Sequence, residues 1–185
     1  MSIPLTELLA SHAPLDAQEA TDLGRMREAA VALEAPLSRH QEEAHFTASA
    51  VLVNRAGDAV ALVHHGKLDR WLQPGGHVEP DDNGDLVRAA LREAREETGC
   101  EVALDPRAPS PLDVDAHLIP ARKSDPAHTH LDVRFLVVTD TPERLRHDPA
   151  ESHAARWFSW DEALALAGDA PLRRLLEKAR RAVRR

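Results

Sequence analysis

One segment restricts the fold more than any other: a helix-forming run that carries three glutamates at helical spacing. Residues 86–98 are predicted to form a helix, and Gly99 suits its end because glycine accepts a left-handed backbone. Each helical residue advances about 100°, so Glu93, Glu96 and Glu97, at i, i+3 and i+4, share one face. The segment therefore predicts a helix with a row of carboxylates on one side.

Three like charges on one helical face need compensation. If the face is partly buried, repulsion at about 6 Å and an effective dielectric near 20 is on the order of 3 kcal/mol per pair. Arg92 and Arg95 offset part of this charge, and a divalent cation would offset more, since Mg²⁺ prefers carboxylate oxygens with retained waters. A solvated acidic face is the commoner outcome for a bare E-x-x-E-E pattern. The flanking sequence therefore has to decide between a solvated face and a metal site.

The sequence around this helix alternates between strand-like and turn-like runs. Runs 46–53 and 59–64 flank a hairpin turn that contains Gly57, and a short strand at 71–73 stops at Pro74. Gly75-Gly76 then allows the backbone to approach another group closely. The remaining predicted strands are residues 101–104, 113–119, 130–139 and 155–159.

Helices are expected at both ends of the chain, at residues 17–35, 163–167 and 171–184. Asp16 caps the first, and Ser159 with Glu162 forms a capping box before the second. Strands interrupted by one central helix, with helices at both ends, indicate an α/β fold with a mixed β-sheet covered on two faces. We divide the chain into an N-terminal helical extension, residues 1–40, and an α/β domain, residues 41–185.

Charge and cysteine content argue against several classes of function. Lys plus Arg number 23 and Asp plus Glu 31, a formal net charge of −8, so we expect no stable binding to nucleic-acid backbones. The single cysteine, Cys100, excludes an intramolecular disulfide and fits a reducing compartment. No signal peptide or membrane-spanning run is recognised, so we expect a cytoplasmic protein without a membrane partner.

The run from Gly75 to Gly99 resembles the Nudix box. The second half of that pattern, R-E-(apolar)-x-E-E-x-G-(apolar), is matched at every specified position by residues 92–100. The similarity extends from about residue 45 to 165 and leaves out the N-terminal helices. It implies a Nudix-type α/β/α sandwich with a mixed β-sheet and an extra N-terminal helical segment, in which residues 41–185 form the Nudix hydrolase domain.

The chain departs from the family pattern in the first half of the box. The pattern places a Glu eight positions before the Arg, but counting back from Arg92 this position falls on Gly84. The loop is therefore two residues longer, and the first Glu is missing. Asp81, Asp82 and Asp85 are candidates to replace it, although a shorter carboxylate reaches less far.

The resemblance implies a Mg²⁺-dependent hydrolase, with Mn²⁺ as an alternative metal. Water would attack phosphorus in a nucleoside diphosphate linked to another moiety and cleave the phosphoanhydride (pyrophosphate) bond. Glu96 and Glu97 are expected as metal ligands, and Glu93 either as a third ligand or as the proton acceptor. Arg92 is expected to orient a box carboxylate, and the Gly76 carbonyl to be an extra metal ligand.

Candidates outside the box lie in a loop and along two strands. Glu151 matches the place of a metal-binding or basic Glu in some family members, although a solvated loop acid is the alternative. His128, His130 and Asp132 alternate along a predicted strand and share one face, which suits metal or substrate phosphate as well as a solvated sheet face. Lys67 is placed to meet phosphate near the glycine pair, or forms a polar hairpin edge.

Other functions stay open at this point. A catalytically inactive Nudix-fold nucleotide-binding or regulatory module would keep the fold, and the missing box Glu is its support. An isomerase branch of the family needs a catalytic cysteine paired with a glutamate, whereas Cys100 fills an apolar box position. The identity of the small-molecule diphosphate substrate and the oligomeric state, with a homodimer as one option, are not readable.

Overall fold

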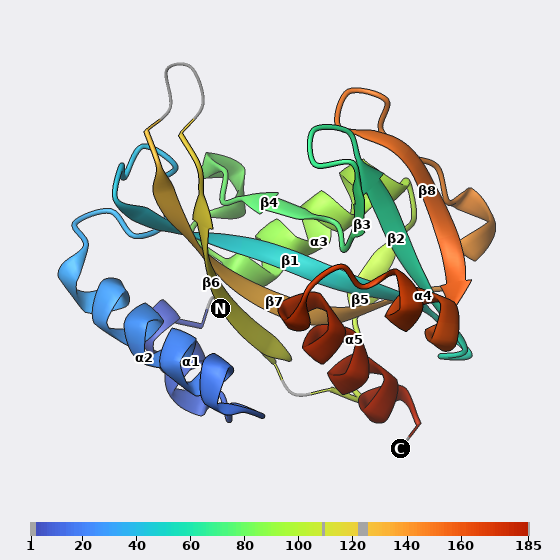
Figure 1. Ribbon diagram of the computed structural model, residues 1–185, viewed down its shortest axis with the longest axis horizontal. Coiled ribbons are helices and arrows are strands. Elements are labelled where there is room, and N and C mark those ends of the chain that lie inside the picture. The colour runs from blue at the N-terminus through green and yellow to red at the C-terminus, as the bar shows by residue number, and fades with distance from the viewer. Residues whose placement is uncertain (1–2, 109, 122–125, 185) are drawn as a thin grey trace.

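A twisted mixed sheet forms the centre of the molecule, and helices lie on both of its faces (Figure 1). The computed structural model describes residues 3–108, 110–121 and 126–184. The strands there are β1 (Ala44–Asn54), β2 (Ala59–His65), β3 (Arg70–Leu72), β4 (Gly75–His77), β5 (Val102–Leu104), β6 (Asp113–Ile119), β7 (His128–Thr139) and β8 (Ser152–Ser159). The helices are α1 (Leu5–Ser11), α2 (Ala17–Ala32), α3 (Leu86–Thr98), α4 (Trp160–Leu166) and α5 (Ala170–Val183), with 3-10 turns η1 (Pro80–Asp82) and η2 (Pro142–Arg144).

The sheet is built around the parallel pair β1 and β7. These strands pair along β1's whole length, from Ala44 opposite Thr129 to Asn54 opposite Thr139. The strand order is β3-β2-β1-β7-β5, with β4 added to β1, β6 to β7 and β8 to β2. Every pair other than β1–β7 is antiparallel. This arrangement confirms the predicted α/β class with a mixed sheet.

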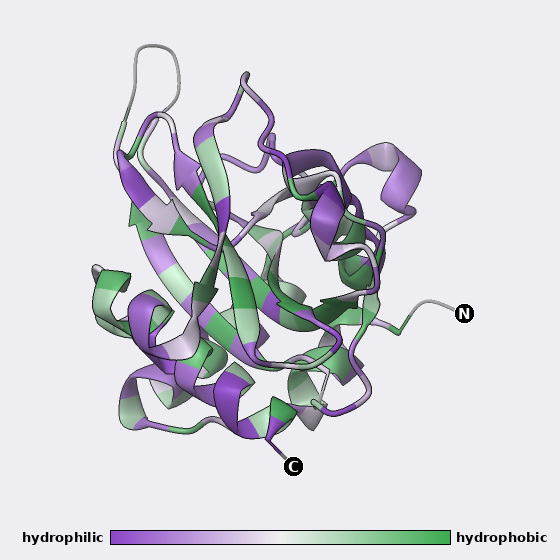
Figure 2. Cartoon of the chain, turned by 90° about the vertical axis from the view of Figure 1, so that its right-hand side faces the viewer, coloured by the Kyte–Doolittle hydropathy of each residue, from purple (hydrophilic) through white to green (hydrophobic). Residues whose placement is uncertain are grey.

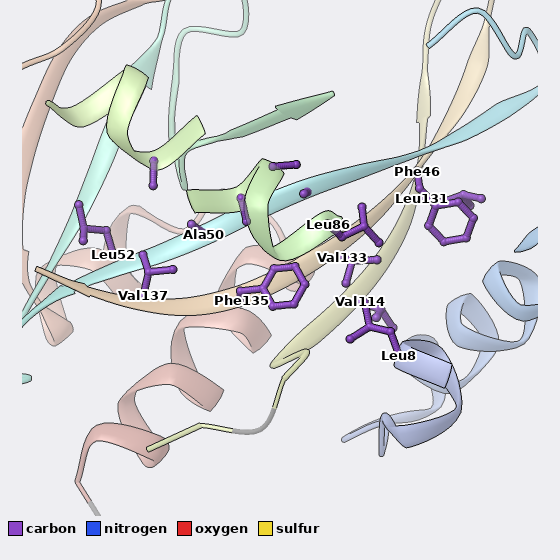
Figure 3. Packing of buried hydrophobic residues seen from close by; sticks show 14 of the residues in the cluster. Leu8, Phe46, Ala50, Leu52, Leu86, Val114, Leu131, Val133, Phe135 and Val137 are labelled. Carbon is purple, nitrogen blue, oxygen red and sulfur yellow. The ribbon is translucent and has the colours of Figure 1, made fainter. Parts of the chain in front are cut away.

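Each face of the sheet has its own apolar core because alternate strand residues point to opposite sides. On one face Phe46 and Phe135 pack with α1, α2 and α3 (Figure 3). On the other, Val51 and Leu136 pack with Leu175 of α5 and with α4. The strands in Figure 2 show the same alternation as green and purple bands. Each fully buried side chain of this size contributes roughly 1.5–3 kcal/mol to folding.

The second face changes from apolar to polar along the same two strands. Beyond the part under α4 and α5, β1 presents His45, Thr47 and Ser49, and β7 presents His130, Asp132 and Arg134. The register sets these side chains side by side, because His45 pairs with His130, Thr47 with Asp132 and Ser49 with Arg134. This polar half of the sheet is the floor on which a site can be built.

The predicted boundaries agree best where a capping signal marks the end of an element. Helix α3 and strand β6 have the predicted bounds, and Gly99 ends α3 with φ 67°. Helix α2 is capped by Asp16 as predicted but ends at Ala32 rather than Ala35, with Leu33 already extended before Ala35-Pro36. Helix α1 and strand β4 were not predicted.

Helix α4 starts at Trp160, directly after the Ser159 capping box, and not at residue 163 as predicted. The N-terminal extension predicted for residues 1–40 contains α1 and α2, and its boundary stays a prediction. Among the described residues, no helix is both long and apolar enough to cross a membrane.

Candidate active site

Helix α3 presents its glutamates beside β4 because its small residues allow it to lie close to the sheet. The Asp85 side chain caps the helix by accepting from the Val87 and Arg88 N–H groups. Ala90 and Ala94 are fully buried in the core that α3 shares with β1. Glu93 and Glu97 follow Ala90 at i+3 and i+7, so they lie on the same side of the helix as the alanines and are buried next to the glycine pair of β4.

Two box glutamates meet a third acid from the loop before β8. The carboxylates of Glu93, Glu97 and Glu151 offer oxygens that all lie within 4.8 Å of one another, and we call these three residues the carboxylate cluster. Glu93 and Glu97 are buried, whereas Glu151 is exposed. The Glu151 carbonyl accepts from the Gly66 N–H at 2.9 Å, which holds this loop against the β2–β3 hairpin.

The glycine pair of β4 fits between β1 and the carboxylates. The Gly75 N–H donates to Glu97 Oε1 at 2.8 Å. A Cβ on Gly76 would lie 2.5 Å from Glu93 Oε1, so a larger residue would displace that carboxylate. A Cβ on Gly75 would collide with Ser49. Both glycines are therefore required for the close approach that was expected of them.

Arg92 connects the box to the loop that precedes it. Its guanidinium donates to Glu93 Oε1 and Glu96 Oε2, each at 2.9 Å, and to Asp82 Oδ2 at 2.8 Å. It also donates to the His77 carbonyl at 2.8 Å. Arg92 thus holds a box carboxylate in the way that the sequence suggested, while Glu96 keeps a half-exposed side chain and stands outside the carboxylate cluster.

Within the described residues, the carboxylate cluster has a single cationic partner, Arg92. In the described parts of the chain, no ion pair involves Glu97 or Glu151, and Glu93 pairs with Arg92 only. The pKa of Glu97 is raised to about 8, mainly by burial and also by the charges of Glu93 and Glu151, against the opposing Gly75 hydrogen bond. Burial likewise raises the pKa of Glu93 to about 7, although Arg92 opposes the shift. Among the described residues, Glu97 and Glu151 therefore lack the positive partner that Arg92 gives to Glu93.

Asp82 is the candidate that contacts the box where the family pattern has its first Glu. It is buried, and it accepts from the Glu79 N–H at 2.8 Å as well as from Arg92. Burial opposes its ionisation, but the hydrogen bonds from Arg92 and the Glu79 N–H and the charges of Arg92 and Arg88 together outweigh this, so the pKa is lowered. Of the other two candidates, Asp85 caps α3 and the exposed Asp81 lines the cavity described below.

A cavity of about 900 Å³ opens beside the carboxylates. The sequence-predicted residues among those that line it are Lys67, Gly76, Arg92, Glu93, Glu96, His130, Asp132 and Glu151. Neither Glu97, which is buried behind Gly75, nor His128 is among the lining residues. The structure thus brings most of the predicted site residues to one cavity.

The floor of this cavity is not the solvated sheet face that the sequence left open. Asp132 is 2% exposed and accepts from Thr47 at 3.0 Å, Ser49 at 2.9 Å and Arg134 at 2.8 Å. Arg134 is also buried, and its Nη2 donates to Asp115 at 2.9 Å. For Asp132 and Arg134 that alternative is wrong because both side chains are buried in ion pairs and hydrogen bonds, whereas His128 and His130 are half-buried.

Behind the floor lies a set of charges that the sequence did not reveal. We call it the buried ion network: Glu19, Asp113, Asp115, Asp132, Arg134, Arg174 and Lys178. Arg174 of α5 bridges to Asp113 at 2.8 Å, and Lys178 to Asp113 at 3.1 Å and to Glu19 of α2. The alternation of Asp113 and Asp115 was the signal, but their partners lie in distant segments.

The sequence pointed to only two of the five histidines that gather beside the cavity. His45, His77 and His117 lie around the predicted His128 and His130, from three further strands. The pKa of His130 is lowered to about 2, mainly by burial and also by the neighbouring His77 and His117. A His-x-His pair on one strand was visible in the sequence, whereas the other rings meet it only through strand pairing.

Comparison with known families agrees with this geometry. The NUDIX domain pattern matches residues 43–179, which is most of the chain and contains the whole candidate site. The chain belongs to the NUDIX domain family. The resemblance proposed from the box is therefore confirmed, and the N-terminal helices lie outside the matched range.

Individual relatives share this Nudix domain at moderate identity. The m7GpppN-mRNA hydrolase NUDT17 of Bos taurus is 31% identical over 104 residues, which cover 52% of this chain and 34% of the relative. The chain thus spans about a third of the length of that curated relative.

Two solved structures resemble the fold. A C. elegans Ap4A hydrolase has a TM-score of 0.54 and 20% identity, over 72% of this chain and 93% of its own. A NUDIX family hydrolase from Clostridium perfringens has a TM-score of 0.55 and 24% identity, over 76% and 96%. At these identities the likeness establishes the fold of this Nudix domain alone.

Cys100 of this Nudix domain lies in the core. It is 1% exposed, and burial raises the pKa of its thiol. It packs among the apolar residues between α3 and the sheet and does not line the cavity. The cysteine that an isomerase would need is therefore not available here.

Proposed function

We propose that this Nudix domain is a divalent-metal-dependent hydrolase that cleaves a phosphoanhydride bond in a nucleoside diphosphate linked to another moiety. One observation carries the proposal: Glu93, Glu97 and Glu151 converge within 4.8 Å while Glu97 and Glu151 have no ion-pair partner in the described residues. Phosphate groups and acids repel each other, so a positive ion between them is required for both to share the cavity.

The residues present fit Mg²⁺ or Mn²⁺. The cluster offers oxygen donors only, which hard divalent cations prefer, and one of its acids is exposed so that water can complete the coordination. We assign Glu93, Glu97 and Glu151 as the residues that hold the ion, with Glu96 and the Gly76 carbonyl as additional oxygen donors. When bound, the ion supplies charge neutralisation to the phosphate oxygens and lowers the pKa of an attacking water.

The protein's own groups fix the position of these acids. Arg92, itself held by Asp82, keeps Glu93 and Glu96 oriented, and the Gly75 N–H holds one oxygen of Glu97. Glu93 either completes the ligand set or accepts the proton of the attacking water. Such preorganised groups supply most of the rate enhancement in phosphoryl chemistry.

The cavity is of the size that a nucleotide needs. Small-molecule sites commonly measure 300–1,000 Å³, and this one is about 900 Å³. We propose that Lys67 at its rim pairs with substrate phosphate and that His130 and Asp132 form the floor beneath the bound substrate. The name of the Bos taurus relative, an m7GpppN-mRNA hydrolase, supports a nucleotide-derived substrate.

The alternative of an inactive binding module loses its support. It rested on the missing box Glu, and Asp82 contacts Arg92 in its place. No observation favours the module over the enzyme. Three statements stay expectations from the sequence: the protein has no nucleic-acid or membrane partner, a homodimer is possible, and its location is cytoplasmic.

A substrate screen tests the proposal. The protein is incubated with Mg²⁺ or Mn²⁺ and a panel of dinucleoside polyphosphates and nucleoside diphosphate sugars, and phosphate is measured after treatment with a phosphatase. We expect turnover of at least one compound, its loss in Glu97→Gln, and its retention in Glu101→Gln, an exposed acid just beyond α3. Undiminished turnover in Glu97→Gln would remove the basis of the assignment.

A further inference from the structure

Five histidine rings gather at the polar end of the sheet, next to the proposed catalytic site but apart from its carboxylates. They come from four strands: His45 from β1, His77 from β4, His117 from β6, and His128 and His130 from β7. Neighbouring ring centroids lie between 5.0 and 5.6 Å apart. The proposed hydrolysis leaves most of these rings without a role.

Two of the rings are oriented by backbone carbonyls. His45 Nδ1 lies 3.1 Å from the Gln41 carbonyl, and His128 Nδ1 lies 2.9 Å from the Pro126 carbonyl. A carbonyl oxygen only accepts, so in each ring the hydrogen is on Nδ1 and a neutral Nε2 keeps its lone pair. Histidines that bind metal are typically held in this way, with the second ring nitrogen donating to a carbonyl or carboxylate.

His45 Nε2 is an orphaned buried atom. His45 is 2% exposed, and its Nε2 is one of two buried side-chain nitrogen or oxygen atoms without a hydrogen-bond partner among the described residues. Leaving such an atom unsatisfied costs about 1–3 kcal/mol. A group that accepts its lone pair would remove this cost, and no N–H or O–H donor of the described residues does so.

The three donor atoms are close enough to share one ion. One nitrogen each from His45, His128 and His130 lies within 4.8 Å of the other two. His128 Nε2 and His130 Nε2 are 3.2 Å apart. Two nitrogens on a tetrahedral zinc, with Zn–N bonds of about 2.0–2.1 Å, are about 3.3 Å apart, so this pair already has ligand spacing. Small ring rotations bring the third nitrogen in.

We propose that His45, His128 and His130 form a second metal site, which binds one zinc-type divalent cation. Imidazole suits Zn²⁺ and its neighbours in the transition series, whereas Mg²⁺ prefers the oxygens of the carboxylate cluster, so the two sites select different ions. The hydrogen of His130 moves to its Nδ1 when the ion binds, and no proton needs to leave the site. Three histidines leave a fourth position for water or another ligand.

The site would tie the start of β1 to the start of β7. His45 and His130 are register partners across the parallel pair, and His130 also lines the cavity. An ion here therefore fixes one wall of the cavity on the polar face of the sheet. It sits in a set of residues that is separate from Glu93, Glu97 and Glu151, so its binding can be tested independently of hydrolysis.

Zinc titration of the full chain tests the proposal. Isothermal titration with Zn²⁺ in excess Mg²⁺, and the visible absorption of Co²⁺ in place of Zn²⁺, report the number and kind of ligands. We expect one tight site per chain with a tetrahedral Co²⁺ spectrum. His128→Ala and His130→Ala should each weaken binding by more than about 100-fold, which is more than the loss expected from a residue that only orients a ligand. His153→Ala, an exposed histidine of β8, should bind as the wild type does.

Two further variants separate this site from the carboxylates. Glu97→Gln should keep the zinc affinity, because its side chain belongs to the other ion. His45→Ala should lose it, and circular dichroism checks its fold; the partly exposed His128→Ala decides the question if His45→Ala does not fold. Wild-type protein that takes up no zinc, or zinc lost in Glu97→Gln but retained in His128→Ala, overturns the proposal.

Discussion

The carboxylate cluster and the buried ion network contain similar acids in opposite electrostatic settings. The network joins four carboxylates to Arg134, Arg174 and Lys178 deep inside the molecule. The cluster joins three carboxylates to a single guanidinium, that of Arg92, at the wall of a cavity. The two regions are adjacent, since Asp132 of the network is also part of the cavity floor.

The difference appears in the ionisation of the acids. In the network, burial alone would raise the pKa of Glu19, yet hydrogen bonds from His12, the Leu15 N–H and Lys178 lower it far below its usual range. In the cluster, burial raises the pKa of Glu97 to about 8 and nothing cationic offsets it. We infer that the network is complete as it folds and that the cluster is completed by an ion from outside.

Breaking the buried ion network should produce the largest loss in the free energy of unfolding. Arg134→Met removes the cation that contacts Asp113, Asp115 and Asp132 while keeping an apolar side chain of similar length. Removal of one partner from a buried ion pair costs about 3–5 kcal/mol, so we expect a loss of this size in the free energy of unfolding, measured with urea.

The matched control for this variant is an exposed ion pair. Arg55 bonds to Asp140 on the surface, and Arg55→Ala should leave the unfolding midpoint unchanged. If Arg134→Met is no less stable than Arg55→Ala, the network is not a structural element and the comparison with the cluster fails.

In the absence of metal, neutralising an acid of the carboxylate cluster should not lower the free energy of unfolding, in contrast to the loss expected for Arg134→Met. Glu97→Gln keeps an oxygen for the Gly75 N–H and removes a buried charge that Glu93 and Glu151 repel. We expect the metal-free variant to be at least as stable as the wild type at pH 8. At 100 times the dissociation constant, Mg²⁺ or Mn²⁺ should stabilise the wild type by about 2.7 kcal/mol and the variant far less.

Thermal unfolding in EDTA and in metal separates these two expectations. Glu101→Gln serves as the control acid, because it is exposed and outside the cavity. A metal-free Glu97→Gln variant that is clearly destabilised would mean that this carboxylate is structural, like those of the network.

Local signals in the sequence were enough for α3 and its row of glutamates. Asp85, the helical period and Gly99 determine where this helix begins, which way its acids point and where it ends. Strand β4 was missed because Gly75-Gly76-His77 has no strand propensity of its own, and its place depends on the fit of glycine against Ser49. Helix α1 was missed because Pro4 offers it no side-chain cap.

The contacts between distant segments could not be predicted. An alternating Asp113-x-Asp115 pattern looks like a solvated sheet face until α2 and α5 bring Glu19, Arg174 and Lys178 to it. The same holds for the histidines, which meet through pairing of four strands. For the site, periodicity placed the box glutamates on one face, but their proximity to Glu151 depends on a turn some 55 residues later in the chain.

Asp82 connects the loop before α3 to Arg92 of the box. Replacing it should lower turnover by less than the loss of a metal-binding glutamate would. Asp82→Asn weakens the bonds that hold Arg92, so Glu93 and Glu96 lose part of their orientation. Partners that orient a ligand typically contribute 10–100-fold, and we expect turnover to fall by about 10-fold. Asp82→Glu, which introduces the residue type of the family pattern, should keep most of the wild-type turnover.

Asp85→Ala is the companion variant to Asp82→Asn. It removes the cap of α3 and should cost stability, about 1 kcal/mol, with little change in turnover. Equal kinetic effects of Asp82→Asn and Asp85→Ala would show that Asp82 acts through the fold of the loop and not through Arg92.

The smallest of the expected effects is the change of the metal-free protein's free energy of unfolding with pH. Burial raises the pKa of Glu93 to about 7 and of Glu97 to about 8, from an ordinary 4.5. The folded state therefore holds protons that the unfolded chain has already released, and their contribution to stability is lost as pH rises toward 8. From pH 7 to 8.5 we expect a fall on the order of 1 kcal/mol in the free energy of unfolding.

The window between pH 7 and 8.5 separates these two acids from the shifted histidines and from the lowered acids of the network. Burial lowers the pKa of His77 to about 4 and of His130 to about 2, so their contribution grows with pH only until the unfolded histidines lose their protons near 6.5. The lowered acids of the network are ionised in both states above pH 6. Glu97→Gln should flatten the fall measured with urea in EDTA, and saturating Mg²⁺ should do the same in the wild type. An equal fall in all three samples would place its origin outside the carboxylate cluster.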